Sequence, residues 1–244
     1  MSNHFKIIVP FYNVSRTISK TVNSALLQEY DNYHIYLIDD MSTDDSAQVV
    51  ESIKSTKITF IKNNEKKHSL RNIYETIHNH TFDEDIVLIL DGDDFLYNKQ
   101  VLSTLDRKYN DHNCWLTYGS YINLSTMNRG KFATELPKQV IESNTFRDYK
   151  WCTSHLRTFR SFLFKQIKTE DLKDDNGNFF TITGDLAIMF PMLEMSRERS
   201  LYIHDLLYIW NDLNELNDHK KDNKLQVETE MFIRGLNKYD RYIR

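Results

Sequence analysis

The chain has 244 residues, of which 40% are hydrophobic and 27% are charged, a composition typical of a globular protein. Its 31 basic and 35 acidic side chains leave a formal net charge of -4, which gives no reason to expect a nucleic-acid partner. Cys114 and Cys152 are too few for a disulfide framework or a cysteine zinc site, and no apolar run reaches the ~18 residues of a membrane span. We therefore expect a cytoplasmic protein without a signal peptide or transmembrane segment.

Short apolar segments alternate with helical ones over the first 125 residues. The segments 5–9, 34–38, 58–62 and 86–90 have the continuous apolar character of buried parallel strands. Between them, apolar residues recur every three to four positions over 14–26, 49–53 and 70–77, as on one face of a helix. Ser42 and Thr43 are candidate caps of the second helix. The alternation predicts a doubly wound α/β fold, a mostly parallel sheet flanked by helices.

The pattern changes after these repeats. The segment 114–124 predicts a strand in a mixed or antiparallel setting, and the polar segment 125–150 predicts loops. Further on, 155–167 indicates a strand or short helix, 168–184 a loop, 185–196 a helix containing Pro191, and 201–211 a strand. From Asp222 onward we expect a C-terminal helix whose apolar side is formed by four residues: Leu225, Met231, Phe232 and Leu236. No linker composition divides the chain, so we expect a single domain over 1–244.

The fourth predicted strand ends in "DGDD", where Asp91, Asp93 and Asp94 lie close together. In open α/β sheets, ligands bind at the carboxyl ends of the strands. Neighbouring carboxylates repel each other and need a proton or a cation between them, and oxygen ligands suit Mg²⁺ or Mn²⁺. The pattern therefore indicates a metal–diphosphate site. A solvated acidic turn that caps a helix near Asn98 is the alternative.

Other interpretations of "DGDD" do not fit its spacing. A calcium-binding EF-hand loop requires Gly at its sixth position and Glu at its twelfth, where this sequence has Leu96 and Leu102. The chain also contains neither a Walker motif nor a GxGxxG loop. The metal–diphosphate site and the solvated acidic turn therefore remain the two interpretations of this segment.

Two further strand ends carry side chains that suit a nucleotide base. The first strand ends in "VPFYN" and the second in "IDDMSTDDS", so Tyr12 and the pair Asp39/Asp40 converge at one edge of the sheet. An aromatic ring can stack on a flat base while a carboxylate accepts its ring N–H, which suits a pyrimidine. Alternatively, Tyr12 is a core ring and the two aspartates are turn residues.

The blocks "FYN", "IDDMSTDDS", "RN" and "DGDD", in this order over residues 5–124, resemble family 2 glycosyltransferases of the GT-A fold. The later strings "SHLRTFRSFLF", "GDLAIMFPMLEMS" and "NDHK" are similar to family 2 domains of large DNA viruses and phages. The resemblance implies a metal-dependent, inverting, hexosyltransferase-type enzyme. It would move a sugar from a UDP-sugar to a hydroxyl of a glycan, a protein or a lipid-linked acceptor.

The resemblance also implies roles for individual residues. Tyr12 would lie against uracil, Asp40 would bind its N–H, and Asp39 would support the turn. Arg71, with Lys66 and Lys67 before it, would contact base or diphosphate. The donor-binding candidates are Pro10, Tyr12, Asp39, Asp40, Arg71, Asp91, Gly92 and Asp93. Asp91 and Asp93 form the DxD motif, and the candidate ligands of Mn²⁺ or Mg²⁺ are Asp91, Asp93, Asp94 and His155.

In this family an acidic residue at the start of a later helix acts as the catalytic base. Asp185 in "TGDLAIM" holds that position, although Gly184 stands where the family often has an acidic or amide residue. A helix cap is the alternative role. Residues 1–124 would then bind the nucleotide sugar, 125–221 would supply the base and the acceptor site, and 222–244 would form the terminal helix.

Other interpretations remain open. Trp151 and Trp210 either stack on sugars or pack in the core, and His204 and His219 are either surface residues or late contributors to the site. A sugar nucleotidyltransferase would carry a glycine-rich, basic loop after the first strand, which "PFYNVSRT" lacks, and a non-catalytic nucleotide-sugar binder is the third hypothesis. The sequence leaves open the sugar, the acceptor, the linkage and the oligomeric state, a homodimer included.

Overall fold

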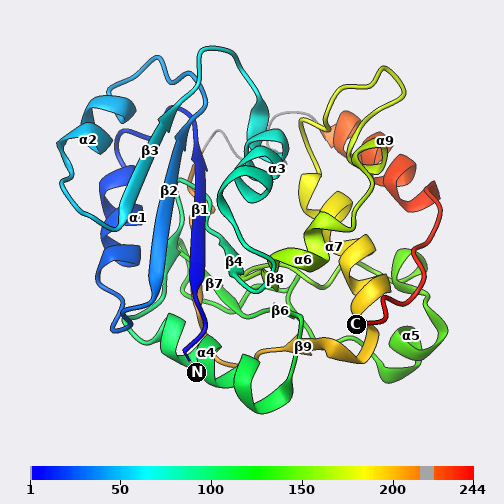
Figure 1. The fold of residues 1–244 in the computed structure, drawn as a ribbon. Helices are drawn as coiled ribbons and strands as arrows, with labels where there is room; N and C mark the ends of the chain where they lie inside the picture. The colour runs from blue at the N-terminus through cyan, green and yellow to red at the C-terminus, as the bar shows by residue number, and fades with distance from the viewer. Residues whose placement is uncertain (1, 215–222) are drawn as a thin grey trace.

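The computed structural model describes residues 2–214 and 223–244 (Figure 1). The larger sheet contains, in spatial order, β3 (Ile58–Lys62), β2 (Tyr33–Asp39), β1 (Phe5–Phe11), β4 (Ile86–Ile89), β8 (Thr158–Arg160), β6 (Leu116–Tyr118) and β9 (Ser200–Tyr202). The first four strands are mutually parallel, whereas β8 runs antiparallel to both β4 and β6. The predicted mostly parallel α/β sheet is thus confirmed.

Helices cover both faces of this sheet because its central strands are apolar on both sides. In β1, Ile7 and Val9 belong to one hydrophobic cluster and Ile8 to the other. The first cluster includes side chains of α1 (Ile18–Leu26), α2 (Ser46–Ser52) and α4 (Val101–His112). The second includes side chains of α3 (His68–His80), α6 (Ser161–Lys165) and α7 (Gly184–Ser196). Continuous apolar strands are expected where helices bury a parallel sheet from both sides.

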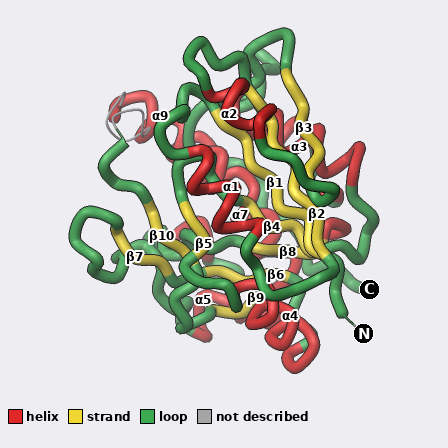
Figure 2. The backbone as a smooth tube through the Cα atoms, turned by 90° about the vertical axis from the view of Figure 1, so that its left-hand side faces the viewer, coloured by secondary structure: helices red, strands yellow, loops and turns green. Residues whose placement is uncertain are grey.

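A second, three-stranded sheet lies beside the larger one (Figure 2). Its central strand β10 (Tyr208–Trp210) pairs antiparallel with β5 (Phe95–Leu96) and parallel with β7 (Tyr121–Asn123). The single strand predicted over 114–124 is therefore two short strands, because β6 joins the larger sheet and β7 the smaller. The pairing with β5 brings β10 against the segment that follows Asp94.

Two expectations on local structure were wrong. The segment 125–150 contains α5 (Lys138–Ser143) and the 3-10 helix Phe146–Asp148 in addition to loops. The N-cap of α2 is Asp45. Ser42 and Thr43 instead bond Asn13, whose backbone N–H donates to Ser42 Oγ at 3.0 Å and whose Oδ1 accepts from the Thr43 N–H at 2.7 Å.

The C-terminal helix α9 (Asn223–Gly235) buries a face that matches the predicted one only in part, since Phe232 packs against the core as expected. Ile233 is its fully buried residue, whereas Met231 is 70% exposed and Leu225 42% exposed. The buried Arg147, paired with Glu194 at 2.6 Å, donates to the Ile233 carbonyl at 2.6 Å and so fixes this face. Across the described part of the chain, no helix has both the length and the apolar character to cross a bilayer.

Candidate active site

The loop after β4 closes onto the end of β1. Gly92 lies so near β1 that a Cβ added to it would be 2.4 Å from the Cβ of Phe11 and 3.1 Å from the carbonyl oxygen of Pro10, so glycine alone fits there. The backbone N–H of Asp40 also donates to the carbonyl of Phe11, at 2.9 Å. The ends of β1, β2 and β4 therefore meet at one edge of the sheet, as the sequence predicts.

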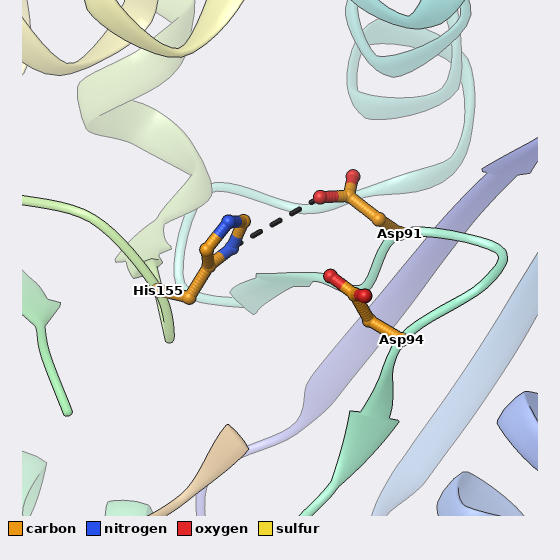
Figure 3. Close-up of side chains that lie close together, drawn as sticks. All are labelled: Asp91, Asp94 and His155. Atoms are coloured by element: carbon orange, nitrogen blue, oxygen red, sulfur yellow. Dashed lines mark ion pairs between the residues drawn. The ribbon is translucent and has the colours of Figure 1, made fainter. Parts of the chain in front are cut away.

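Asp91, Asp94 and His155 form a group that could hold a metal ion (Figure 3). One donor atom from each residue lies within 4.8 Å of the others. Asp94 is 1% exposed, and its two carboxylate oxygens accept hydrogen bonds from the Tyr208 hydroxyl at 2.6 Å and the Asn211 N–H at 2.7 Å. Burial, with the nearby charges of Asp93 and Asp91, raises the pKa of Asp94 well above its ordinary value. A divalent cation would relieve this repulsion, so the residues fit such an ion.

Asp93 lies outside that group. Its Oδ2 accepts a hydrogen bond from Asn214 Nδ2 at 2.6 Å. Burial raises the pKa of Asp93, while this hydrogen bond acts in the opposite direction. The structure thus brings together three of the four predicted metal ligands, Asp91, Asp94 and His155, and directs Asp93 toward the chain that follows β10.

The direction of β8 explains how His155 reaches the aspartates. Because β8 is antiparallel to β4, its first residue, Thr158, pairs with Leu88 near the carboxyl end of β4. The residues just before β8 therefore lie at the same edge of the sheet as Asp91. Nδ1 of His155 is 4.0 Å from Oδ2 of Asp91, and its ring stacks on Tyr208.

Arg157 is a buried cation at the centre of the site, 5% exposed. Its Nη1 donates to Oδ2 of Asp185 at 3.2 Å, and its Nη2 is 3.9 Å from Oδ2 of Asp91. Nη2 is also 3.3 Å from Nδ1 of His155. A guanidinium only donates, so this bond requires Nδ1 to carry a lone pair. Burial and the Arg157 charge both lower the pKa of His155 well below its ordinary value, which agrees with a neutral imidazole.

Asp185 lies in the first turn of α7, at the end of the helix that faces the site. The helix has no side-chain capping bond, and the Asp185 carboxylate bonds Arg157 instead. Gly184 packs closely on α3, since a Cβ there would be 3.2 Å from the Cβ of Leu70. The side chain of Asp185 is 31% exposed and therefore accessible to a substrate.

Tyr12 and Asp40 meet through Lys66. The Lys66 ammonium lies 2.7 Å from the centroid of the Tyr12 ring, 3.5 Å from Oδ2 of Asp40 and 3.2 Å from the Asp40 carbonyl oxygen. Asp40 is 4% exposed and accepts four further hydrogen bonds, from Asn63 Nδ2, Asn72 Nδ2, Lys67 N and His68 N. Burial would raise its pKa, but these hydrogen bonds lower the pKa of Asp40 below its ordinary value.

The remaining donor-site candidates bond neighbouring groups of the protein. Asp39 is fully buried. Its Oδ1 accepts a hydrogen bond from the Ser42 N–H at 2.9 Å, whereas its Oδ2 has no hydrogen-bond partner among the described residues. The Arg71 guanidinium bonds Glu75 and Glu65, each at 2.8 Å, so two carboxylates already engage it. Lys67 also bonds Glu75, at 2.8 Å.

The two tryptophan candidates make packing contacts. Trp151 packs edge-on against Phe190 with the ring centroids 5.8 Å apart, and Trp210 packs edge-on against Tyr121 at 6.1 Å. The side chain of His204 is 77% exposed. His219 lies outside the described residues.

The sequence analysis did not identify four residues that bond the aspartates of the site: Arg157, Tyr208, Asn211 and Asn214. Arg157 had a signal, because it stands two residues after His155, in a segment predicted as a strand or short helix. Tyr208 had none, because its contact with Asp94 depends on the pairing of β10 with β5.

Comparison with known proteins agrees with this geometry. Residues 6–172 match the model of the family "Glycosyl transferase family 2". An uncharacterized glycosyltransferase of Haemophilus influenzae is 32% identical over 120 residues, which cover 47% of this chain and 46% of that protein. The Escherichia coli protein WfaP, named a UDP-Glc:alpha-D-GlcNAc-diphosphoundecaprenol beta-1,3-glucosyltransferase, is 48% identical over 58 residues, 24% of this chain and 23% of that protein. The chain thus spans about half or less of the length of these two relatives.

The fold is also found in a solved structure. TarS 1–349 of S. aureus, in complex with UDP-GlcNAc, superposes with a TM-score of 0.67 at 16% sequence identity, covering 94% of this chain and 65% of that one. At this identity the likeness concerns the fold alone, and it confirms the expected GT-A class.

Proposed function

The chain belongs to glycosyl transferase family 2, and from this premise we propose that it transfers a sugar from a UDP-sugar to a hydroxyl acceptor. The transfer would invert the anomeric carbon and use a bound Mn²⁺ or Mg²⁺. The choice of a uridine donor is supported by WfaP, whose name specifies UDP-Glc, and by TarS, whose structure is a complex with UDP-GlcNAc.

One observation carries the proposal. Asp91, at the end of β4, and Asp185, at the start of α7, lie on either side of the same guanidinium, at 3.9 and 3.2 Å from its nitrogens. An inverting displacement needs a carboxylate on the donor side, where the metal ion and the diphosphate would bind, and a base that faces it across the same site. The two carboxylates come from the two parts of the chain to which the sequence assigns donor binding and base, so a single site would contain both.

The base of the nucleotide would take the place that Lys66 now occupies. Its ammonium contacts the Tyr12 ring and the Asp40 carboxylate together. A uracil ring stacked on Tyr12 would present its N–H toward the same carboxylate. Lys66 would then be free to move toward the diphosphate.

The chemistry follows from the positions of the side chains. Asp91, Asp94 and His155 would hold a divalent ion, which would supply positive charge for the leaving diphosphate, worth about several kcal/mol. Asp185 accepts the proton of the acceptor hydroxyl, a step that typically contributes about 10²–10⁴-fold. Alignment of donor and acceptor in one crevice contributes about 7–11 kcal/mol.

The acceptor would approach from the side of α7. Residues 125–221, with the loop before α7, would shape its binding site, while residues 1–124 would hold the donor. We propose a hydroxyl of a glycan, a protein or a lipid-linked sugar as the acceptor class.

The test is a panel of UDP-, GDP- and dTDP-sugars with Mn²⁺, followed by release of the nucleoside diphosphate. We expect release from at least one UDP-sugar, and loss of release in Asp91→Asn. UDP binding without turnover by any acceptor would favour a non-catalytic binder, and consumption of the donor that depends on pyrophosphate would favour a nucleotidyltransferase. Turnover that is undiminished by EDTA would contradict the metal dependence.

A further inference from the structure

Arg157 joins the donor side of the site to the acceptor side. It is 5% exposed, and as a permanent cation it must be compensated by nearby negative charge. The two compensating carboxylates are Asp185 at 3.2 Å and Asp91 at 3.9 Å. Asp185 is the candidate base and Asp91 is a member of the candidate metal group, so the guanidinium contacts two otherwise separate parts of the site.

The guanidinium and a metal ion would compete for the same atoms. Nη2 of Arg157 faces Oδ2 of Asp91 at 3.9 Å and Nδ1 of His155 at 3.3 Å. Both residues are members of the group that could hold an ion. A cation bound there would need the charge of Asp91, and a lone pair of His155 as well. Two cations cannot both be compensated by the single charge of Asp91.

We propose that Arg157 is a positioning residue that couples the two sides of the reaction. When no divalent ion is bound, it neutralises Asp91 and occupies the Nδ1 lone pair of His155. When an ion binds, the guanidinium is left to Asp185 alone and holds that carboxylate in one orientation at the crevice. The assignment of Asp185 as base rests on the proposed function, whereas the competition for Asp91 does not.

The coupling is reciprocal: the contact of Arg157 with Asp91 weakens metal binding by the same free energy by which a bound metal ion weakens that contact. Loss of the Arg157 charge should therefore strengthen metal binding. Loss of the Asp185 charge should weaken it, since the guanidinium then pairs fully with Asp91. A residue that acts only by filling space would produce neither effect.

The experiment measures Mn²⁺ affinity by calorimetry, without nucleotide, so that it does not depend on turnover. In Arg157→Gln we expect Mn²⁺ to bind at least about 5-fold more tightly than in the wild type, and in Asp185→Asn at least about 5-fold more weakly. In the Arg157→Gln/Asp185→Asn double variant the weakening caused by Asp185→Asn should disappear. Arg157→Lys, which keeps the charge, should retain an affinity near that of the wild type.

Arg160→Gln is the matched control. Arg160 lies at the other end of β8 and bonds the Glu84 carbonyl and Asn3, away from the metal group. Its substitution should leave Mn²⁺ affinity and turnover unchanged.

Folded Arg157→Gln protein with unchanged or weaker Mn²⁺ affinity would overturn the proposal. If Arg157→Gln does not fold, Asp185→Asn alone decides, and an unchanged affinity there overturns the coupling. Where the wild type is active, Arg157→Gln should lower kcat with little change in the donor KM, and turnover equal to that of the wild type would also count against the proposal. A wild type that shows the affinity shifts but turns over no nucleotide sugar would contradict the proposed function and leave the coupling intact.

Discussion

The imidazole of His155 stacks on the phenol ring of Tyr208, with the ring centroids 4.6 Å apart and the planes 4° from parallel. The hydroxyl of the same tyrosine donates to Asp94 Oδ2 at 2.6 Å and lies 3.3 Å from the Asp91 N–H. One side chain from β10 therefore orients all three members of the metal group. The second sheet contributes to the site through this contact.

Tyr208→Phe should weaken metal binding and lower stability. The change leaves the buried Asp94 oxygen with one partner fewer, which costs about 1–3 kcal/mol in the free energy of unfolding. Mn²⁺ calorimetry and urea unfolding measure the two effects. Tyr121→Phe is the control, because Tyr121 packs edge-on against His155, at 5.8 Å, while its hydroxyl makes no bond to these aspartates. Equal losses in the two variants would contradict the role of the Tyr208 hydroxyl.

Tyr12→Ala should weaken UDP binding through loss of a stacking surface. Base–aromatic stacking is worth about 1–3 kcal/mol, so the dissociation constant of UDP should rise by at least about fivefold. Fluorescence or calorimetric titration with UDP at saturating Mn²⁺ measures the change. Phe82→Ala is the control, since Phe82 is 78% exposed and precedes β4 at the opposite edge of the sheet. An unchanged UDP affinity in Tyr12→Ala would place the base elsewhere.

Asp40→Asn should destabilise the protein. Both Asp40 oxygens accept hydrogen bonds, so an amide NH₂ would face a donor and leave it unpaired, at about 1–3 kcal/mol. Urea unfolding at pH 7 measures this loss. The exposed Asp45 provides the control Asp45→Asn, for which we expect a change within about 0.5 kcal/mol.

The same variant should show a specific pH dependence. Because the pKa of Asp40 is lowered in the folded state, its contribution to stability is complete above the unfolded pKa of ~3.9 and is lost as pH falls through the folded pKa. The stability difference between wild type and Asp40→Asn should therefore be constant from pH 7 to about pH 5 and shrink below about pH 4. A difference that grows on acidification would contradict the lowered pKa.

The edge at which the site lies could be predicted because it depends on local patterns. The apolar segments that become β1, β2 and β4 are followed directly by Tyr12, Asp40 and Asp91, and parallel strands place such residues together. The helix that carries Asp185 was predicted for the same reason, from the spacing of its own apolar residues. The suggested likeness to viral and phage domains and the division of the chain at residue 124 stay predictions.

The partners of the aspartates could not be predicted because they depend on long-range pairing. His155 and Arg157 reach the site only because β8 turns antiparallel to β4, and Tyr208 only because β10 pairs with β5. Ile233 of α9 was missed for a similar reason, since its side chain is buried in a core cluster built from distant segments of the chain. Periodicity identifies the face of a helix that is apolar, whereas burial depends on what packs against it.

Asp185→Asn should separate binding from chemistry. The asparagine keeps the size of the side chain and its acceptor oxygen toward Arg157, but it cannot take up a proton. At saturating Mn²⁺ we expect UDP affinity to stay within about threefold of the wild type and kcat to fall at least about tenfold, a threshold below the roughly 10²–10⁴-fold that a general base typically contributes. Steady-state kinetics with the active UDP-sugar, and UDP titration of the same preparation, measure both quantities. Asp111→Asn, an exposed aspartate in α4, controls for the change in net charge. If UDP affinity and kcat fell together by the same factor, Asp185 would be a donor-binding residue and the base would have to be sought elsewhere at this edge of the sheet.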